Sequence, residues 1–219
     1  KEPIEFEVRL EVSGTDIKID FSHAPQQVGG PVNCPFASTV AGARVLITML
    51  ANAMEQPNEG HFRPIEVITR PGTLFYPLPP APCFLYGWSL ISALEALLKS
   101  VGEASPEVVP ARSGACILTL IWWGNREQTG EIWAAGSPLP TGQGAHVRGD
   151  GGTMIHVAQA FGQVPPIELW EAKFPWLIEC YELAPDSGGV GQHMGGSGID
   201  IAWRILEDCT FTSTVEQTE

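Results

Sequence analysis

The chain has 219 residues, of which 44% are apolar and 17% are charged, a composition typical of a globular protein with one large or two small domains. Its net charge of −13 argues against a nucleic acid or an anionic membrane as partner, because the twelve basic residues form no cluster that could bind phosphate groups. No apolar run reaches the ~18 residues that suggest a membrane span. Lys1 to Pro3 show neither an initial Met nor a signal peptide, so we expect a fragment of a longer cytoplasmic protein.

The first half of the chain predicts a hairpin, a strand and two helices. Apolar residues alternate over residues 5–21 around a turn at 13–16, which indicates a hairpin with a three- to five-residue loop. Apolar residues recur at three- and four-residue spacing over residues 36–54 and 87–101, which predicts two long buried helices. A strand is expected over residues 65–69.

The second half predicts strands separated by glycine-rich loops. Strands are expected over residues 115–123, 131–135, 176–183 and 199–206, with a short helical turn opened by residues 165–168. Residues 136–152 are expected to be a long loop, and residues 212–219 a polar tail. The predicted fold class is therefore mixed α+β, with antiparallel or mixed sheets, two long buried helices and extended glycine-rich loops.

Two residue types are informative about packing. The five cysteines include no C-x-x-C pair and predict reduced, buried thiols of a cytoplasmic protein: Cys34, Cys83, Cys116, Cys180 and Cys209. The seven tryptophans are expected in a core or at a subunit interface rather than in a substrate site. The adjacent Trp122 and Trp123 should point to opposite faces of a strand.

The stretch Pro185 to Gly198 contains six glycines in fourteen residues between two predicted strands. Glycine weakens strands, so such a run marks either backbone with positive φ or places where another group approaches the backbone closely. The simple interpretation is a tightly turned loop. The alternative is a site lined by backbone groups.

Short catalytic motifs are absent from the sequence: it contains no G-x-G-x-x-G dinucleotide motif, no nucleophile elbow and no phosphate-binding loop. The five histidines all lie in or beside loops, where they could be structural or transfer protons: His23, His61, His146, His156 and His193. None has the spacing of a helical metal site, so no metal ligand is assigned.

Several segments in a fixed order carry a resemblance to a known family. They are residues 20–33, 35–39, 62–68, 70–73, 79–80, 165–168, 181–191 and 195–198. Together they resemble hydantoinase B, the family that includes the C-terminal part of 5-oxoprolinase and the large subunits of acetone and acetophenone carboxylases. These subunits are several hundred residues long, so residues 1–219 are interpreted as one middle-to-late segment of a hydantoinase B-like domain.

The resemblance implies ATP-dependent activation of a carbonyl group or a cyclic amide. It implies that ATP is handled by a hydantoinase A-like partner subunit of a hetero-oligomer, and that a divalent metal such as Mn or Zn lies outside this segment. Such chemistry needs donors for an oxyanion and a group that transfers protons. We therefore predict proton transfer by His193 and His156, and substrate binding by Ser187, Gly188, Gly189, Gly191, Gln192, Gln26, Asn33 and Arg63.

Departures from the family pattern guide the expected substrate. Gln192 to Met194 stand where the family usually has a basic residue, Ser137 to Gly144 replace a glycine run, and Ala158-Gln159 replace Asn-Thr. Tryptophan and proline in these regions favour a bulky apolar substrate, so we predict carboxylation of an aromatic, acetophenone-like ketone with bicarbonate to a 3-oxo acid. The alternatives are a hydantoinase or 5-oxoprolinase component that hydrolyses a cyclic amide, and a non-catalytic scaffold subunit.

Overall fold

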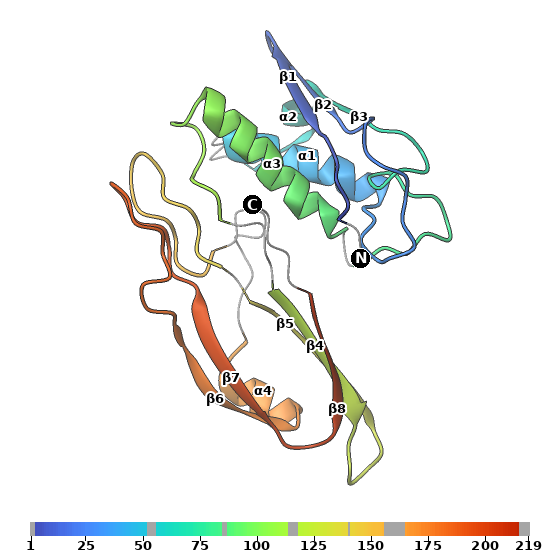
Figure 1. Cartoon of the computed structure of the whole chain (residues 1–219), viewed down its shortest axis with the longest axis vertical. Helices are drawn as coiled ribbons and strands as arrows, with labels where there is room; N and C mark the ends of the chain where they lie inside the picture. The colour runs from blue at the N-terminus through green and yellow to red at the C-terminus, as the bar shows by residue number, and fades with distance from the viewer. Residues whose placement is uncertain are drawn as a thin grey trace. The chain divides into compact units, whose positions relative to one another are not determined.

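The computed structural model describes residues 3–51, 56–84, 87–113, 118–139, 141–155 and 165–214. It divides into two compact units, Lys1–Val109 and Pro110–Glu219 (Figure 1). Both units contain helices and short sheets, which confirms the mixed α+β prediction. No helix in the described part of the chain is both long and apolar enough to span a membrane.

The first unit contains a three-stranded sheet in the order β1-β2-β3. Strands β1 (Arg9–Ser13) and β2 (Asp16–Asp20) are antiparallel, and β3 (Ile65–Ile68) runs parallel to β2. The predicted hairpin is confirmed, but its loop is only Gly14–Thr15 because Ser13 pairs with Asp16. Gly14 adopts a φ of 62°, which a glycine accommodates without strain and which allows this tighter turn.

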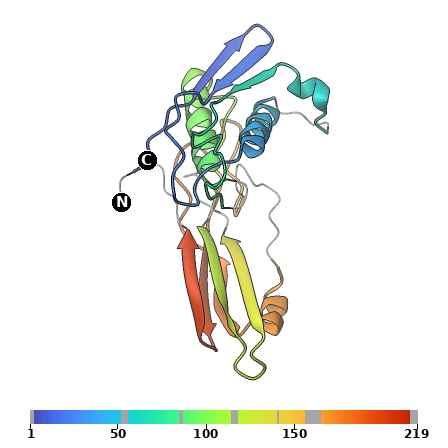
Figure 2. The same cartoon turned by 90° about the vertical axis from the view of Figure 1, so that its right-hand side faces the viewer.

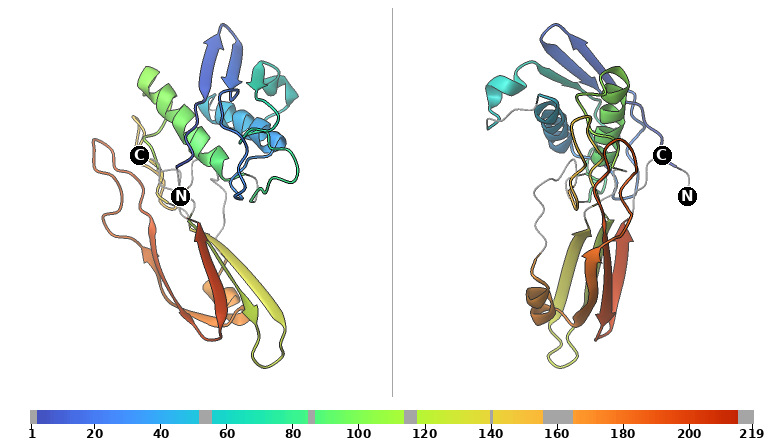
Figure 3. Two further views of the ribbon diagram at one scale, coloured as in Figure 1. Left: turned by 45° about the vertical axis from the view of Figure 1, so that its right-hand side comes forward. Right: turned by 90° about the vertical axis from the view of Figure 1, so that its left-hand side faces the viewer.

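Two long helices form most of the core of the first unit. α1 (Phe36–Leu50) packs against α3 (Ser89–Ala104), while the short α2 (Glu59–Phe62) precedes β3 (Figure 3). The helices approach closely at Gly42, where an added Cβ would lie 2.5 Å from Leu90 Cδ1. The prediction of two buried helices is therefore confirmed. The last residues of the first predicted helix, 52–54, lie outside the described part.

The second unit is a sandwich of two small antiparallel sheets and one short helix. β4 (Leu118–Asn125) lies between β5 (Ile132–Leu139) and β8 (Cys209–Thr214), as Figure 2 shows. The second sheet pairs β6 (Trp176–Leu183) with β7 (Ile199–Ile205), and α4 (Ile167–Lys173) precedes β6. The strand β8 was not predicted from the sequence, because its Thr and Ser residues have the composition of a polar tail.

Aromatic side chains fill the space between the two sheets. The ring of Trp122 lies 5.1 Å from those of both Trp176 and Trp203. Trp122 is 4% exposed and its neighbour Trp123 is 41% exposed, which confirms that the two point to opposite faces of β4. Among the described tryptophans, the core interpretation holds for the buried Trp88, Trp122, Trp133, Trp170 and Trp176, and Trp203 packs against the core of the second unit.

The cysteines are free thiols, but only one of the four that the structure describes is buried. Cys34 is fully buried, Cys180 and Cys209 are partly exposed, and Cys83 is exposed. The prediction of buried thiols is therefore correct for Cys34 alone, and Cys116 lies outside the described residues. An apolar neighbourhood in the sequence did not ensure burial, because a strand or loop exposes part of its residues. Burial raises the pKa of the Cys34 thiol to about 11.

Candidate functional site

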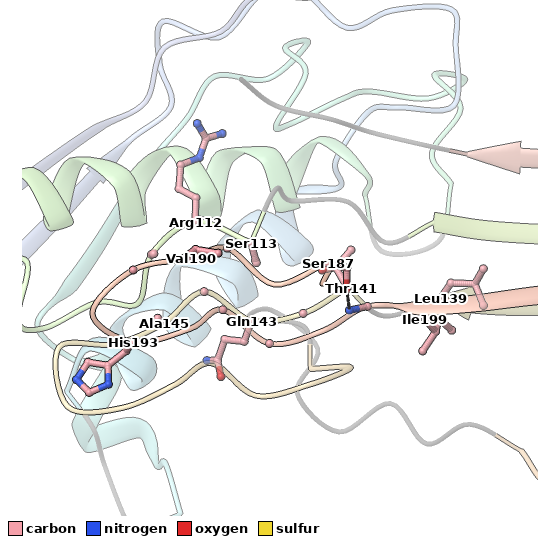
Figure 4. A pocket seen from close by; sticks show the side chains of 18 residues that line it. Arg112, Ser113, Leu139, Thr141, Gln143, Ala145, Ser187, Val190, His193 and Ile199 are labelled. Carbon is pink, nitrogen blue, oxygen red and sulfur yellow. Dashed lines mark hydrogen bonds between the residues drawn. The ribbon is translucent and has the colours of Figure 1, made fainter. Parts of the chain in front are cut away.

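Three loop segments of the second unit, one of them from the glycine stretch, lie backbone against backbone (Figure 4). Gly196 N–H donates to Gln143 O at 2.9 Å, and Gly151 N–H donates to Met194 O at 2.8 Å. On the far side of the 141–153 segment, Ala111 N–H donates to Ala145 O at 2.8 Å. The segments 111–113, 141–153 and 187–198 thus form a layer of loops held together largely by main-chain hydrogen bonds.

Close approach, and not positive φ, explains several of the glycines of this layer. A Cβ added to Gly142 would lie 1.7 Å from Gly196 O, and one added to Gly196 would lie 2.0 Å from Gly152 O. A Cβ on Gly188 would lie 2.1 Å from Gly195 O. No glycine of the 185–198 stretch has a φ in the left-handed region. Any side chain at these positions would force the segments apart.

A pocket of about 610 Å³ opens on this layer, and seven of its lining residues are glycines. Its lining includes Ser187, Gly189, Gly191 and His193 from the glycine stretch, and Gln143 from the neighbouring segment. Acidic side chains are absent from this lining, in a protein whose net charge is −13. The side chains of Arg112 and His193, which also contribute to the lining, extend in opposite directions from the loops (Figure 4).

Three consecutive amides on the rim of the pocket are available as hydrogen-bond donors. Within the described part of the chain, the N–H groups of Gly189, Val190 and Gly191 have no hydrogen-bond acceptor. The Val190 side chain is 93% exposed, so this segment lies at the surface. Neighbouring unpaired amides of this kind can bind a carbonyl oxygen or an oxyanion.

His193 lies beside a carboxylate that the backbone holds in place. Its Nδ1 atom is 3.6 Å from Asp150 Oδ1, and the same oxygen accepts a hydrogen bond of 2.8 Å from Met194 N–H. The two side chains form an ion pair when the imidazole is protonated. Asp150 was not among the predicted site residues, because 43 residues separate it from His193 in the sequence and only folding brings the two together.

The other predicted residues of the glycine stretch have different roles in this structure. The Ser187 hydroxyl donates to Ala184 O at 2.8 Å and accepts from Gly198 N–H at 2.9 Å, so it closes the loop. Gly188 packs against Gly195 and does not line the pocket. Gln192 is exposed and also lies outside the lining. His156, the second predicted proton-transfer residue, is not among the described residues.

Three predicted substrate-binding residues belong to the first unit and do not line this pocket. Asn33 is fully buried, where its Oδ1 accepts from Val28 N–H and its Nδ2 donates to carbonyl oxygens including Pro82 O at 2.7 Å. Its amide is therefore engaged in holding a loop. Gln26 and Arg63 are both exposed. Their assignment to substrate stays a prediction.

The described residues do not fit a metal centre. Within them, no group of three or more His, Cys, Asp or Glu side chains lies close enough together to hold a metal ion. No step through a metal is therefore derived from these residues. Proton transfer by His193 and hydrogen bonding by loop amides are the chemistry that the pocket offers.

The model of one protein family, described as Hydantoinase B/oxoprolinase, matches residues 1–219. The chain belongs to this family. Among relatives, it is 28% identical over 210 residues to an uncharacterised protein of Methanocaldococcus jannaschii. It is also 28% identical over 205 residues to the caprolactamase subunit beta of Pseudomonas jessenii. These matches cover 95% and 91% of this chain but only 36% and 35% of the relatives, so the chain spans about a third of their length.

Two solved structures are similar to the chain in fold. The ATP-dependent caprolactamase of Pseudomonas jessenii matches with a TM-score of 0.77 and 26% identity, over 91% of this chain and 35% of that one. A nucleotide-free acetone carboxylase matches with a TM-score of 0.81 over 95% of this chain and 29% of that one. At 24% identity, the match to acetone carboxylase shows a shared fold and no more.

Proposed function

We propose that this chain is a segment of a hydantoinase B-type subunit of an ATP-dependent, multi-subunit enzyme that acts on the carbonyl carbon of a small molecule. The observation that carries this proposal is the row of three unpaired amides at Gly189 to Gly191 beside His193. The amides would bind the oxygen that becomes negative when the carbonyl is attacked. His193, oriented by Asp150, would transfer the proton.

Hydrolysis of a cyclic amide is the reaction that we favour for this site. The chain is 28% identical to a caprolactamase subunit over nearly its whole length. Attack on a cyclic amide creates an oxyanion and needs a proton on the leaving nitrogen. The backbone amides can bind the oxyanion, and His193 can donate the proton. In this proposal a hydantoinase A-like partner binds ATP, and any divalent metal is held outside this segment.

Carboxylation of a ketone with bicarbonate is the second candidate. Its support is the fold shared with acetone carboxylase, which has the higher of the two TM-scores. Preference for an aromatic, acetophenone-like ketone remains a finer prediction with less support, because the tryptophans that suggested it pack in the sandwich core. Trp122, Trp133 and Trp176 belong to that core, and none of them lines the pocket.

The test is an assay of ATP hydrolysis by the complete enzyme with two classes of substrate. We expect turnover to be stimulated by a cyclic amide such as caprolactam. Stimulation only by a ketone with bicarbonate would reject the first candidate in favour of the second. If neither class of substrate stimulates ATP hydrolysis, the carbonyl chemistry proposed for this subunit is rejected.

A matched pair of histidine variants tests the site itself. His193→Gln should lower kcat about 100-fold or more, as expected for loss of a general acid–base group. The control His23→Gln changes an exposed histidine of the first unit and should leave kcat unchanged. Full activity of His193→Gln in an intact assembly would instead favour the non-catalytic scaffold.

A further inference from the structure

The two flanks of the sandwich in the second unit are covered unequally. On the flank of β5, Trp133 is 7% exposed because its ring lies 5.9 Å from that of Trp176 and 6.2 Å from that of Phe174. Trp170 of α4 also packs beside Trp176, at 6.4 Å. In Figure 2, α4 lies on the side of β5, and β8 forms the opposite edge of the sheet. The β5 flank is therefore closed by a helix and by β6.

The flank of β8 lacks such a cover in the part of the chain that the structure describes. Phe211 is paired with Trp122 across the β4–β8 ladder, so both side chains lie on the face that carries the core. Their rings are 5.3 Å apart. Nevertheless Phe211 is 51% exposed, whereas Trp122 is 4% exposed. Since the Phe211 ring points to the core side and is still half exposed, a covering element is missing next to it among the described residues. We call this place the unfilled position.

The unfilled position lies beside β7. The three-stranded sheet faces a sheet of only two strands, so β8 has no strand opposite it, and the edge of β7 away from β6 is unpaired within the described residues. Ile205 continues the inward alternation of Ile201 and Trp203 on β7, yet it is 38% exposed. Neighbouring strands are about 4.8 Å apart, so one further strand beside β7 would lie beneath β8.

We propose that a β-strand from the part of the subunit outside these 219 residues pairs with the free edge of β7 and covers Phe211. About two thirds of each curated relative lies outside the region that this chain matches, which supplies the length for such a strand. The occupant carries apolar residues at alternate positions, because the core-facing residues of β8 are Cys209, Phe211 and Ser213, and none of them is charged.

Two cysteine variants of the complete subunit test this cover by alkylation, read at each site by peptide mass spectrometry. Phe211→Cys places a thiol on the core face of β8, and the control Thr212→Cys places one on the outer face of the same strand. If the strand is present, the thiol at 211 should react about tenfold more slowly than the thiol at 212. Equal rates would overturn the proposal.

Hydrogen exchange in the unsubstituted complete subunit provides a second measurement that does not depend on either variant. A free edge leaves every other amide of Ile199–Ile205 open to rapid exchange, whereas strands on both sides protect all of them. We expect protection along the whole strand. Protection of alternate amides only would contradict the proposal. Protection that appears only at concentrations where the subunit dimerises would also contradict it, because a second copy would then cover the edge.

Discussion

Main-chain hydrogen bonds join loops in both units, as from Cys34 N–H to Leu74 O and from Gly196 N–H to Gln143 O, but the side chains around these bonds differ. In the first unit, buried polar side chains bind the backbone: Asn33 bonds to three residues of its surroundings, and Thr39 Oγ1 donates to Phe75 O at 2.8 Å. In the second unit, the backbone of one loop bonds directly to the next, and glycines remove the side chains that would keep them apart.

This difference determines which amino-acid substitutions each unit tolerates. Side-chain anchors can be lost one at a time, each at the cost of a few hydrogen bonds. A backbone layer has few side chains to lose, but a single added Cβ forces two segments apart. The layer also leaves amide groups free at its rim, as at Gly189 to Gly191, and this is where we place substrate binding.

The largest effect should come from Gly196→Ala. The new Cβ would lie 2.0 Å from Gly152 O, so the two segments must separate, and we expect unfolding of the second unit to become easier by about 3 kcal/mol. The measurement is urea unfolding followed by tryptophan fluorescence, since all tryptophans except Trp88 belong to the second unit. Gly149→Ala is the control, because nothing lies within 4 Å of its added Cβ. Equal stability of the two variants would show that the backbone layer is not tightly packed.

The next effect should come from Asn33→Ala in the first unit. The change empties the fully buried position of the Asn33 side chain and leaves Val28 N–H and the carbonyl of Pro82 without their partner, which should cost about 2 kcal/mol. Urea unfolding followed by far-UV circular dichroism measures it. Gln26→Ala, at an exposed position of the same loop, should change the stability by less than about 0.5 kcal/mol. If Asn33→Ala were equally mild, water would be replacing the amide and the loop would be less closed than its hydrogen bonds indicate.

A smaller effect is expected from Ser187→Ala, which tests the side-chain anchor within the glycine stretch. The Ser187 hydroxyl bonds to Ala184 O and Gly198 N, and its loss should cost about 1 kcal/mol, because both groups are near the surface and water can replace it. Ser197→Ala is the matched control, since Ser197 takes part through its backbone N–H, which bonds to Thr153 Oγ1. Unfolding of the second unit in urea compares the two. A loss of stability as large as that of Gly196→Ala would mean that the Ser187 side chain stabilises the glycine stretch as much as its close backbone packing does.

The sequence correctly predicted the structural features that depend on short, periodic spacings of residues. The hairpin, both long helices and the opposite faces of Trp122 and Trp123 follow from spacings of two to four residues. The sequence could not decide why the glycines are present, because Gly142 lies against Gly196, and Gly196 against Gly152, only after folding brings these segments together. The pairing of Asp150 with His193 was hidden for the same reason.

Strand β8 was missed for a different reason. A strand at the edge of a sheet exposes one face, and β8 places Thr210 and Thr212 there, so half of its residues look like those of a disordered tail. Likewise Asn33 was predicted to bind substrate because loop amides often do so. In the structure Asn33 is fully buried and donates to Pro82 O, from a segment 49 residues later, a contact that the sequence did not show.

The smallest effect concerns Asp20, whose carboxylate accepts a hydrogen bond of 2.7 Å from Ser22 N–H at the start of the first unit's loop. Hydrogen bonds from Ser22 hold the pKa of this carboxyl below its usual value. The lowered pKa stabilises the folded state above the unfolded pKa, near pH 4, and this stabilisation is lost as the pH falls through the folded pKa. Because Asp20 is close to solvent, Asp20→Asn should cost less than about 0.5 kcal/mol at neutral pH. Thermal unfolding of both proteins should show this difference at pH 7 and none near pH 2. A difference that persists in acid would mean that the carboxylate charge is not what anchors the loop.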